Sequence, residues 1–215
     1  MIKKKVYYNL KNLIIKSEFE PNQKLSEINL SKQFNVSRTP IRESLIKLEQ
    51  EGLVDIIPQK GTFVSKINKE EVKEAQFIRE SLEISTLKLL SSFISDEQVM
   101  QLREIINQQI ISLRAKKIMD FFHLDEKFHR TMANMAGYKM VWDVIKETKV
   151  PIDRIRMLSL PILTEVELMI FQHREIVTSL IDNNPKKIEE NVKTHLSEVI
   201  HSIDKLSKRY YDYFI

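Results

Sequence analysis

The first fifty residues repeat hydrophobic positions at the spacing of a helix, in three runs separated by polar breaks. The first run predicts a helix that ends near Ser17, and the second predicts a short helix that ends near Phe34. A third helix is predicted to begin after Ser37. The apolar positions that define the first two runs are Val6, Leu10, Leu13, Ile14, Leu25, Ile28, Leu30 and Phe34.

The hydrophobic period shortens after this third helix. "LVDII" and "GTFVSKI" are short β-prone runs, and "PQKG" between them contains the proline and glycine of a turn. Three helices followed by a hairpin are the element order of a winged helix-turn-helix. We therefore predict this fold for residues 1–66.

Residues 67–215 carry no comparable strand signal and read as five or six helical segments. The fold class predicted for the whole chain is mainly α, with a small β-hairpin wing in the first domain and an all-α bundle in the second. The breaks between the helical segments are expected near Ser95–Asp96, Gly137, Pro151, Pro161 and Asn183–Pro185.

Composition narrows the classes of protein to consider. The chain has 42% hydrophobic and 30% charged residues, so it can bury a core, and it has no cysteine, which excludes disulfides and thiolate metal sites. No apolar run reaches the roughly 18 residues of a membrane-spanning helix, and the start "MIKKKVYYNL" lacks the apolar segment of a signal peptide. We therefore expect a cytoplasmic protein.

The positive charge lies in the first domain. Residues 1–66 hold 12 Lys and Arg against 7 Asp and Glu, whereas residues 67–215 hold 22 against 23. A basic small domain on a neutral larger one suggests that the small domain meets a polyanion, although ordinary surface lysines would give a similar balance.

The third predicted helix has signals at both ends. Ser37 is a suitable N-cap, whose hydroxyl would accept a backbone hydrogen bond, and Pro40 would lie in the first turn. Gly52 would stop the helix in a left-handed conformation. Ile41, Leu45 and Leu48 form its apolar stripe.

Arg38 and Arg42 lie four residues apart on a face that this stripe does not use, with Thr39 beside them. A recognition helix places such residues at its N-terminus, where arginine can grip guanine with two hydrogen bonds. Either arginine alone would more often be an ordinary solvated residue. The helix order, the hairpin and the charge of the first domain favour DNA binding.

"SRTPIRESLIKLEQEGLV" followed by "QKGTFVSKI" resembles the DNA-binding domain of GntR-type transcriptional regulators, over roughly residues 5–66. This resemblance implies a transcriptional regulator that binds double-stranded DNA, and we expect no enzymatic activity. We expect a homodimer on a two-fold operator, because one recognition helix rarely supplies enough contacts. Two departures stand out. Asn22 replaces a common glycine, although asparagine also tolerates positive φ, and Ile28 stands where some relatives use arginine. The DNA contacts implied by the resemblance are Ser37, Arg38, Thr39, Arg42, Lys60 and Gly61.

All five histidines lie in the second domain. Asp125 and His129 are four residues apart, so both project from one helix face, while His173 and His195 occur in the apolar rhythm of two later helices. Each histidine alone would more often be structural. A carboxylate with three imidazoles would suit Zn²⁺, Ni²⁺, Mn²⁺ or Fe²⁺.

"FIRESLE", D-x3-H, "HREI" and "THL" resemble the FCD helical domain of the FadR subfamily, across about residues 70–210. The resemblance implies that Asp125, His129, His173 and His195 hold a divalent metal whose coordination a small carboxylate effector completes. His123 and His201 fall outside this pattern and are interpreted as surface or structural residues.

Arg79 is a candidate contact for the effector carboxylate, and a salt bridge with Glu83 is an equally weighted alternative. Arg154 and Arg156 could serve the same purpose, and the sequence does not rank them. Two other functions remain open at this stage. The metal itself could be the regulatory signal, or the cluster could belong to a metal-dependent enzyme, although no general base or nucleophile is recognisable for the latter.

Overall fold

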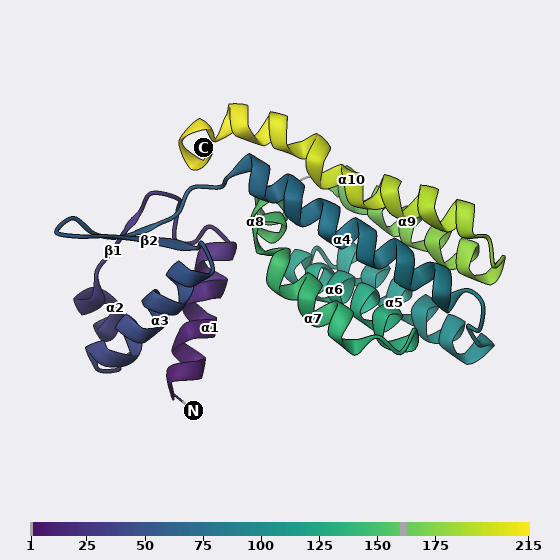
Figure 1. The fold of residues 1–215 in the computed structure, drawn as a ribbon, viewed down its shortest axis with the longest axis horizontal. Helices are drawn as coiled ribbons and strands as arrows, with labels where there is room; N and C mark the ends of the chain where they lie inside the picture. Colours follow the sequence, from purple (N-terminus) through teal and green to yellow (C-terminus); the bar gives the residue numbers. More distant parts are fainter. Residues whose placement is uncertain (1, 160–162) are drawn as a thin grey trace. The chain divides into compact units, whose positions relative to one another are not determined.

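The structure is a computed structural model in which residues 2–159 and 163–215 are described. These residues form a mainly α-helical chain with a small antiparallel sheet near the N-terminus, which confirms the predicted fold class (Figure 1). The helix break predicted near Pro161 lies outside the described residues.

The chain divides into two compact units. The first runs to Val72 and also takes in Pro151–Leu158 and Ser202–Ile215. The second consists of the described residues within Lys73–Val150 and Ser159–His201. Because the first unit gathers segments from three parts of the sequence, the predicted division into domains 1–66 and 67–215 stays a prediction.

Three helices begin the first unit: α1 (Ile2–Ile15), α2 (Glu27–Gln33) and α3 (Arg38–Gln50). α1 and α2 both pack against α3, which places α3 between them. The apolar stripe predicted for α3 is fully buried, and it meets the apolar positions predicted for α1. The predicted apolar positions that are buried in the two helices are Val6, Leu10, Ile14, Ile41, Leu45 and Leu48.

α3 ends in the left-handed conformation that its sequence predicts. Gly52 has φ +69°. Its N–H donates to the carbonyl of Glu49 at 2.9 Å, and the N–H of Leu53 donates to that of Leu48 at 2.9 Å. These two bonds form a Schellman motif, which pairs carbonyls that the helix end would otherwise leave without a donor.

The predicted hairpin consists of β2 (Val54–Ile57) and β3 (Gly61–Val64), with Val54 opposite Val64. A two-residue strand, β1 (Lys24–Leu25), pairs with the other edge of β3 and gives the order β1-β3-β2 among the described residues. The sequence did not predict β1. Asn22 adopts φ +66° just before it, which confirms that asparagine serves in place of glycine at this turn.

Seven α-helices follow in the described part of the chain. Figure 1 shows those of the second unit running side by side as a bundle. In chain order the seven helices of both units are α4 (Lys69–Leu90), α5 (Asp96–Arg114), α6 (Ile118–Met135), α7 (Lys139–Thr148), α8 (Val150–Ser159), α9 (Leu163–Ile181) and α10 (Pro185–Arg209).

Breaks occur at the predicted positions after α4, before α7 and before α10. The break predicted near Pro151 falls at Lys149, because Pro151 lies in the first turn of α8, where a missing N–H costs nothing. A further break between α5 and α6 was not predicted. Lys116 adopts φ +57° there, a conformation that no glycine or asparagine signals in the sequence.

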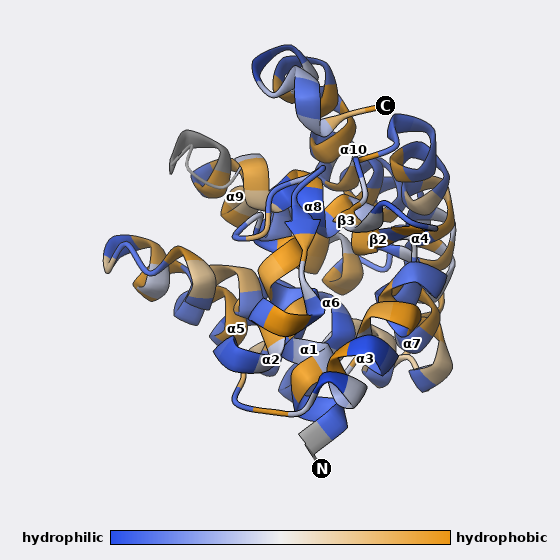
Figure 2. Cartoon of the chain, turned by 90° about the vertical axis from the view of Figure 1, so that its left-hand side faces the viewer, coloured by the Kyte–Doolittle hydropathy of each residue, from blue (hydrophilic) through white to orange (hydrophobic). Residues whose placement is uncertain are grey.

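The core of the second unit forms where α5 packs against α6 and α9. Phe121 and Phe128 on α6 are among its largest fully buried side chains. Figure 2 shows hydrophobic and hydrophilic residues alternating along these helices, as amphipathic packing requires. None of the helices in the described residues combines the length and hydropathy needed to cross a bilayer.

The C-terminal segment packs within the first unit. Ile67 forms a parallel bridge with Phe214, and its N–H donates to the carbonyl of Tyr213 at 2.7 Å. Nη2 of Arg154 donates to the carbonyl of Ser65 at 2.6 Å. Burial lowers the pKa of Arg154 to about 10, although Asp55 and Glu71 act to raise it. Arg154 and the C-terminal segment therefore both hold the residues that follow β3.

Candidate DNA-binding surface and metal centre

The N-terminus of α3 presents its polar side chains to solvent. Ser37, Arg38, Thr39 and Arg42 are all exposed, as a surface that reads DNA requires. Ser37 occupies the N-cap position, but its hydroxyl accepts no capping hydrogen bond from the described residues, so this part of the prediction was wrong. A hydroxyl that is not engaged in capping is available to an external acceptor or donor.

Glu27, on α2, joins the two arginines of α3. Its Oε2 accepts from Nη2 of Arg38 at 3.0 Å and from Nη2 of Arg42 at 3.0 Å. Its Oε1 accepts from Nε of Arg42 at 2.9 Å. Hydrogen bonding from Arg42 lowers the pKa of Glu27, partly offset by burial and reinforced by Arg38. The carboxylate is therefore ionised at neutral pH.

The predicted wing residues lie at the turn between β2 and β3. Lys60 is exposed, and its backbone N–H donates to the carbonyl of Ile57 at 3.1 Å. Gly61 has φ +122°, and a Cβ there would lie 2.9 Å from Cε of Lys24. The turn thus needs glycine for its backbone conformation, and it presents lysine to solvent.

Asp125, His129, His173 and His195 converge in the second unit. Asp125 and His129 lie on α6, His173 on α9 and His195 on α10, and all four side chains are buried. One ligand atom from each residue lies within 4.8 Å of the others. The structure therefore brings together all four residues of the predicted metal set.

The Nε2 atoms of the three histidines face one another. His195 Nε2 lies 3.2 Å from Nε2 of His129 and 3.3 Å from Nε2 of His173. Asp125 Oδ1 lies 3.5 Å from Nε2 of His173 and 4.0 Å from Nε2 of His129. Ligands about 2.0–2.1 Å from a tetrahedral ion stand about 3.3 Å apart, so most of these separations match those around one small ion.

The opposite nitrogen of each ring meets an oxygen from another side chain. His129 Nδ1 lies 2.6 Å from Oε2 of Glu83. The corresponding distances are 2.9 Å from His173 Nδ1 to Oε1 of Gln109 and 3.0 Å from His195 Nδ1 to Oε1 of Gln172. With each Nδ1 donating its proton to the oxygen beside it, each Nε2 would present a lone pair to the others.

This donor set is suited to a cation. In that tautomer three imidazole lone pairs and one carboxylate converge in a buried place, which is unfavourable unless a positive ion lies among them. Burial lowers the pKa of His195 well below its usual value, and His173 and His129 lower it further. Neutral imidazole is the form that binds a metal.

Arg79 and Glu83 form the buried ion pair that the sequence offered as one of two readings of Arg79. Arg79 Nε donates to Oε1 of Glu83 at 2.6 Å. Burial raises the pKa of Glu83, but Arg79 and His129 outweigh that effect and hold the pKa at about 2. The ionised Glu83 thus connects Arg79 to His129.

A cavity lies beside His129. The space open to the centre of a water-sized molecule is about 10 Å³, which is close to that of one water. Its lining is largely apolar, apart from His129 and two residues of α4. The lining residues are Glu83, Thr86, Leu87, His129, Met132, Ala133, Val141 and Ile145.

Sequence reasoning missed three residues of these two sites: Glu27, Gln109 and Gln172. Gln109 carried a signal, because it interrupts the apolar face of α5 and is fully buried. Gln172 and Glu27 carried no comparable signal. His123 and His201 are exposed, which agrees with their interpretation as residues outside the metal set.

Comparisons with known proteins agree with both parts of the chain. The family model described as bacterial regulatory proteins, gntR family, matches residues 2–64, and the FCD domain model matches residues 74–198. The chain is 33% identical over 213 residues to the HTH-type transcriptional repressor RspR of Escherichia coli, covering 99% of this chain and 93% of that protein.

A second relative is an uncharacterized HTH-type transcriptional regulator in an unstable DNA locus of Streptomyces ambofaciens, 34% identical over 201 residues, with coverage of 94% of this chain and 84% of that protein. Among solved structures, Escherichia coli McbR/YncC superposes with a TM-score of 0.79 at 16% identity, over 96% of this chain and 98% of that one. The chain therefore belongs to the GntR family of transcriptional regulators, with an FCD domain after its DNA-binding helices.

Proposed function

We propose that the protein is a regulator of the FadR subfamily whose affinity for a two-fold operator is controlled from a metal-containing FCD domain. The proposal rests on one observation: three imidazole Nε2 atoms and a carboxylate lie close together in the core. The Nδ1 of each imidazole also contacts a side-chain oxygen, which fixes the orientation of the ring. The E. coli relative is named a repressor, and repression is the activity we propose for this chain.

Operator recognition is assigned to the exposed N-terminus of α3 and to the wing. Arg38 and Arg42 would contact guanine edges or phosphates, and Lys60 would contact the phosphate backbone. The hydroxyls of Ser37 and Thr39 and the backbone of Gly61 would complete the contacts. The exposure of these residues and the net positive charge of the first 66 residues support the assignment.

Asp125, His129, His173 and His195 would hold one divalent metal ion, with Zn²⁺, Ni²⁺, Mn²⁺ and Fe²⁺ as the candidates. Such an ion would offer a Lewis-acidic coordination position to a small carboxylate effector. Arg79 would act on the effector through its charge, because its Nε already donates to Glu83. An effector controls DNA binding only to the extent that it binds one conformation of the protein better than another.

Direct metal sensing is the second candidate, and the cavity beside His129 favours it. The space beside His129 that is open to the centre of a water-sized molecule is small, so an organic acid would bind there only with side-chain movement. In this case the ion itself would shift the protein between conformations, and no organic effector would be needed.

A homodimer is proposed because one recognition helix rarely makes enough contacts for specific binding. Exposed apolar side chains on α4 support an association surface: Phe77 and Leu89 are both exposed there. Sedimentation of the full chain at several concentrations would measure this association.

The first test is elemental analysis of untagged, unchelated protein beside its His173→Ala/His195→Ala variant. We expect about one metal per chain in the parent and none in the variant. The matched control is His123→Ala/His201→Ala, which removes two exposed histidines and should keep the metal. A folded parent that takes up no metal after resupply would contradict the proposed metal centre.

The second test separates the two candidates. DNA affinity is measured over a series of buffered metal concentrations, and then with saturating metal over a panel of small carboxylic acids. A response to an acid at constant metal supports effector control. A response to metal within the physiological range, without any acid, supports direct sensing. A regulator that responds to neither would contradict both.

A further inference from the structure

We propose that Glu27 positions Arg38 and Arg42 for operator recognition and thereby sets the sequence specificity of the protein. The inference rests on the proposed DNA contacts of the two arginines. It concerns a residue of α2 that would touch no base itself, and that acts through the side chains it holds.

Glu27 is placed by the start of α2. It directly follows the N-cap Ser26, whose hydroxyl accepts from the N–H of Asn29 at 3.4 Å. Its carboxylate therefore leaves the first turn of α2 and reaches the first turn of α3. Because α2 and α3 pack together, the position of this carboxylate relative to α3 is fixed by the fold.

The hydrogen bonds leave each arginine with donors for DNA. Glu27 takes the Nε and one Nη2 hydrogen of Arg42, and one Nη2 hydrogen of Arg38. A guanidinium carries five N–H donors, so Arg42 keeps both hydrogens on Nη1 and one on Nη2. That end of the guanidinium is still two-pronged, which is what guanine O6 and N7 require.

The exposure of the three side chains indicates that their hydrogen bonds orient the arginines more than they stabilise the fold. The side chain of Glu27 is 23% exposed, whereas those of Arg38 and Arg42 are 57% and 62% exposed. Exposed ion pairs contribute little to stability. A carboxylate that holds two exposed arginines restricts their rotamers, and this reduces the entropy lost when they grip DNA.

The charge of Glu27 also opposes indiscriminate binding. It cancels one of the two positive charges at the start of α3, and so weakens attraction to any phosphate backbone. Removal of the charge should therefore act in opposite directions on the two kinds of binding. Operator affinity should fall because the arginines lose their orientation, and affinity for random DNA should stay the same or rise.

The experiment compares the full-length parent with Glu27→Gln in titrations of an operator duplex and a random duplex at several salt concentrations. We expect the ratio of operator to random affinity to fall about tenfold, which is the lower end of what one well-placed bidentate arginine contributes. Glu27→Asp keeps the negative charge on a side chain that is one methylene shorter, so its ratio of operator to random affinity should lie between those of Glu27→Gln and the parent. An unchanged ratio, or tighter operator binding by Glu27→Gln, would overturn the inference.

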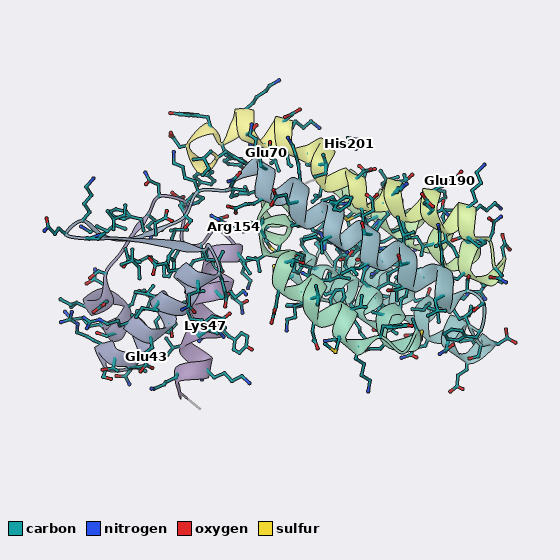
Figure 3. The ribbon with its side chains drawn as sticks, in the orientation of Figure 1. Glu43, Lys47, Glu70, Arg154, Glu190 and His201 are labelled. Atoms are coloured by element: carbon teal, nitrogen blue, oxygen red, sulfur yellow. The ribbon has the colours of Figure 1, made fainter. Side chains whose placement is uncertain are left out.

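Glu43→Gln is the matched control. Glu43 lies on α3 itself (Figure 3). Its Oε1 accepts from Nζ of Lys3 at 2.9 Å. This variant removes the same charge from the same unit without touching either arginine, so its affinity ratio should equal that of the parent. If Glu43→Gln lowers the ratio of operator to random affinity by the same factor, net charge alone explains the effect of Glu27→Gln, and the inference is overturned.

Arg38→Ala and Arg42→Ala separate this inference from the proposed function. Unchanged operator binding in both arginine variants would remove the proposed DNA contacts themselves. If the arginine variants lose operator binding but Glu27→Gln keeps the affinity ratio of the parent, the proposed arginine contacts are retained and only the role of Glu27 is excluded. In the Arg38→Ala/Arg42→Ala background, Glu27→Gln should have no further effect on the ratio, because a positioning residue acts only through its partners.

Discussion

Nδ1 of His129 lies 2.6 Å from Oε2 of Glu83, and Oε1 of the same carboxylate accepts from Nε of Arg79 at 2.6 Å. A carboxylate behind a metal-binding histidine fixes the ring orientation and makes its Nε2 a stronger donor to the ion. Arg79 keeps that carboxylate ionised in a buried place. One buried chain of contacts therefore runs from α4 to the metal set.

Glu83→Gln should weaken metal affinity about 10- to 100-fold while leaving all four ligands in place. The reason is that a neutral amide is a poorer acceptor for the Nδ1 proton and leaves Arg79 buried without its charged partner. Competition against a chromophoric chelator would measure the change. Glu74→Gln serves as the control, since Glu74 lies on the same helix but is exposed, and an equal loss in both variants would exclude a specific role for Glu83.

Apart from the capping bond of Ser37, the sequence predicted α3 well, because the signals for its face and its end are local. Ile41 and Leu45 give the buried face, and Gly52 gives the end of the helix. It failed at β1, because a two-residue strand is too short to show an alternation of apolar and polar positions. The existence of β1 depends on pairing with β3, more than thirty residues later in the chain.

At the candidate metal site, too, the sequence predicts what depends on local spacing and fails where distant segments meet. The four-residue spacing of Asp125 and His129 puts both on one face of α6, and this can be read from the sequence. His173 and His195 join them only through helix packing, so their selection rested on a family resemblance. Gln109 interrupts the apolar face of α5, but neither spacing nor resemblance pairs Gln109 or Gln172 with a histidine ring, because these contacts depend on side-chain orientation in the assembled bundle.

Removal of the metal should destabilise the second unit. A ligand that binds only the folded protein adds about 2.7 kcal/mol to the free energy of unfolding when its free concentration is 100 times its dissociation constant. Chelation should abolish this contribution and return three buried imidazoles and a carboxylate to mutual repulsion. Thermal unfolding with and without chelator would reveal the loss, and His173→Ala/His195→Ala should unfold at the same temperature in both buffers.

Glu189 should make stability depend weakly on pH in the acid range, because its ion pairs with Lys88 and Lys193 are partly exposed and solvent screens them. Its Oε2 accepts from Nζ of Lys88 and its Oε1 from Nζ of Lys193, both at 2.6 Å, and hydrogen bonding from Lys193 and Lys88 lowers its pKa to about 2. A carboxyl whose folded pKa lies below the unfolded value of 4.5 stabilises the protein above that value. The contribution is then lost as the pH falls from 4.5 toward 2.

We therefore expect Glu189→Gln to unfold at a lower temperature than the parent near neutral pH, with the difference shrinking as the solution is acidified. Both proteins should be metal-free, so that loss of metal on acidification does not contribute to the difference between the parent and Glu189→Gln. Glu190→Gln is the control on the same helix (Figure 3). Oε1 of Glu190 lies 3.9 Å from Nζ of Lys186, and its side chain is mostly exposed. A pH-independent difference for Glu189→Gln would contradict the expectation.

Lys60 and Arg42 should affect DNA binding in different ways, because the two proposed contacts meet different parts of the duplex. Lys60→Ala should weaken binding to all sequences alike and reduce the slope of log affinity against log salt by about 1, as the loss of one phosphate contact does. Arg42→Ala should cost about 1–3 kcal/mol on the operator and far less on random DNA, if its free edge grips a guanine. Titrations of operator, single-base operator variants and random DNA at several salt concentrations would separate the two. If Lys60→Ala loses affinity at one operator position only, Lys60 contacts a base. If Arg42→Ala loses affinity equally on all sequences, Arg42 contacts a phosphate.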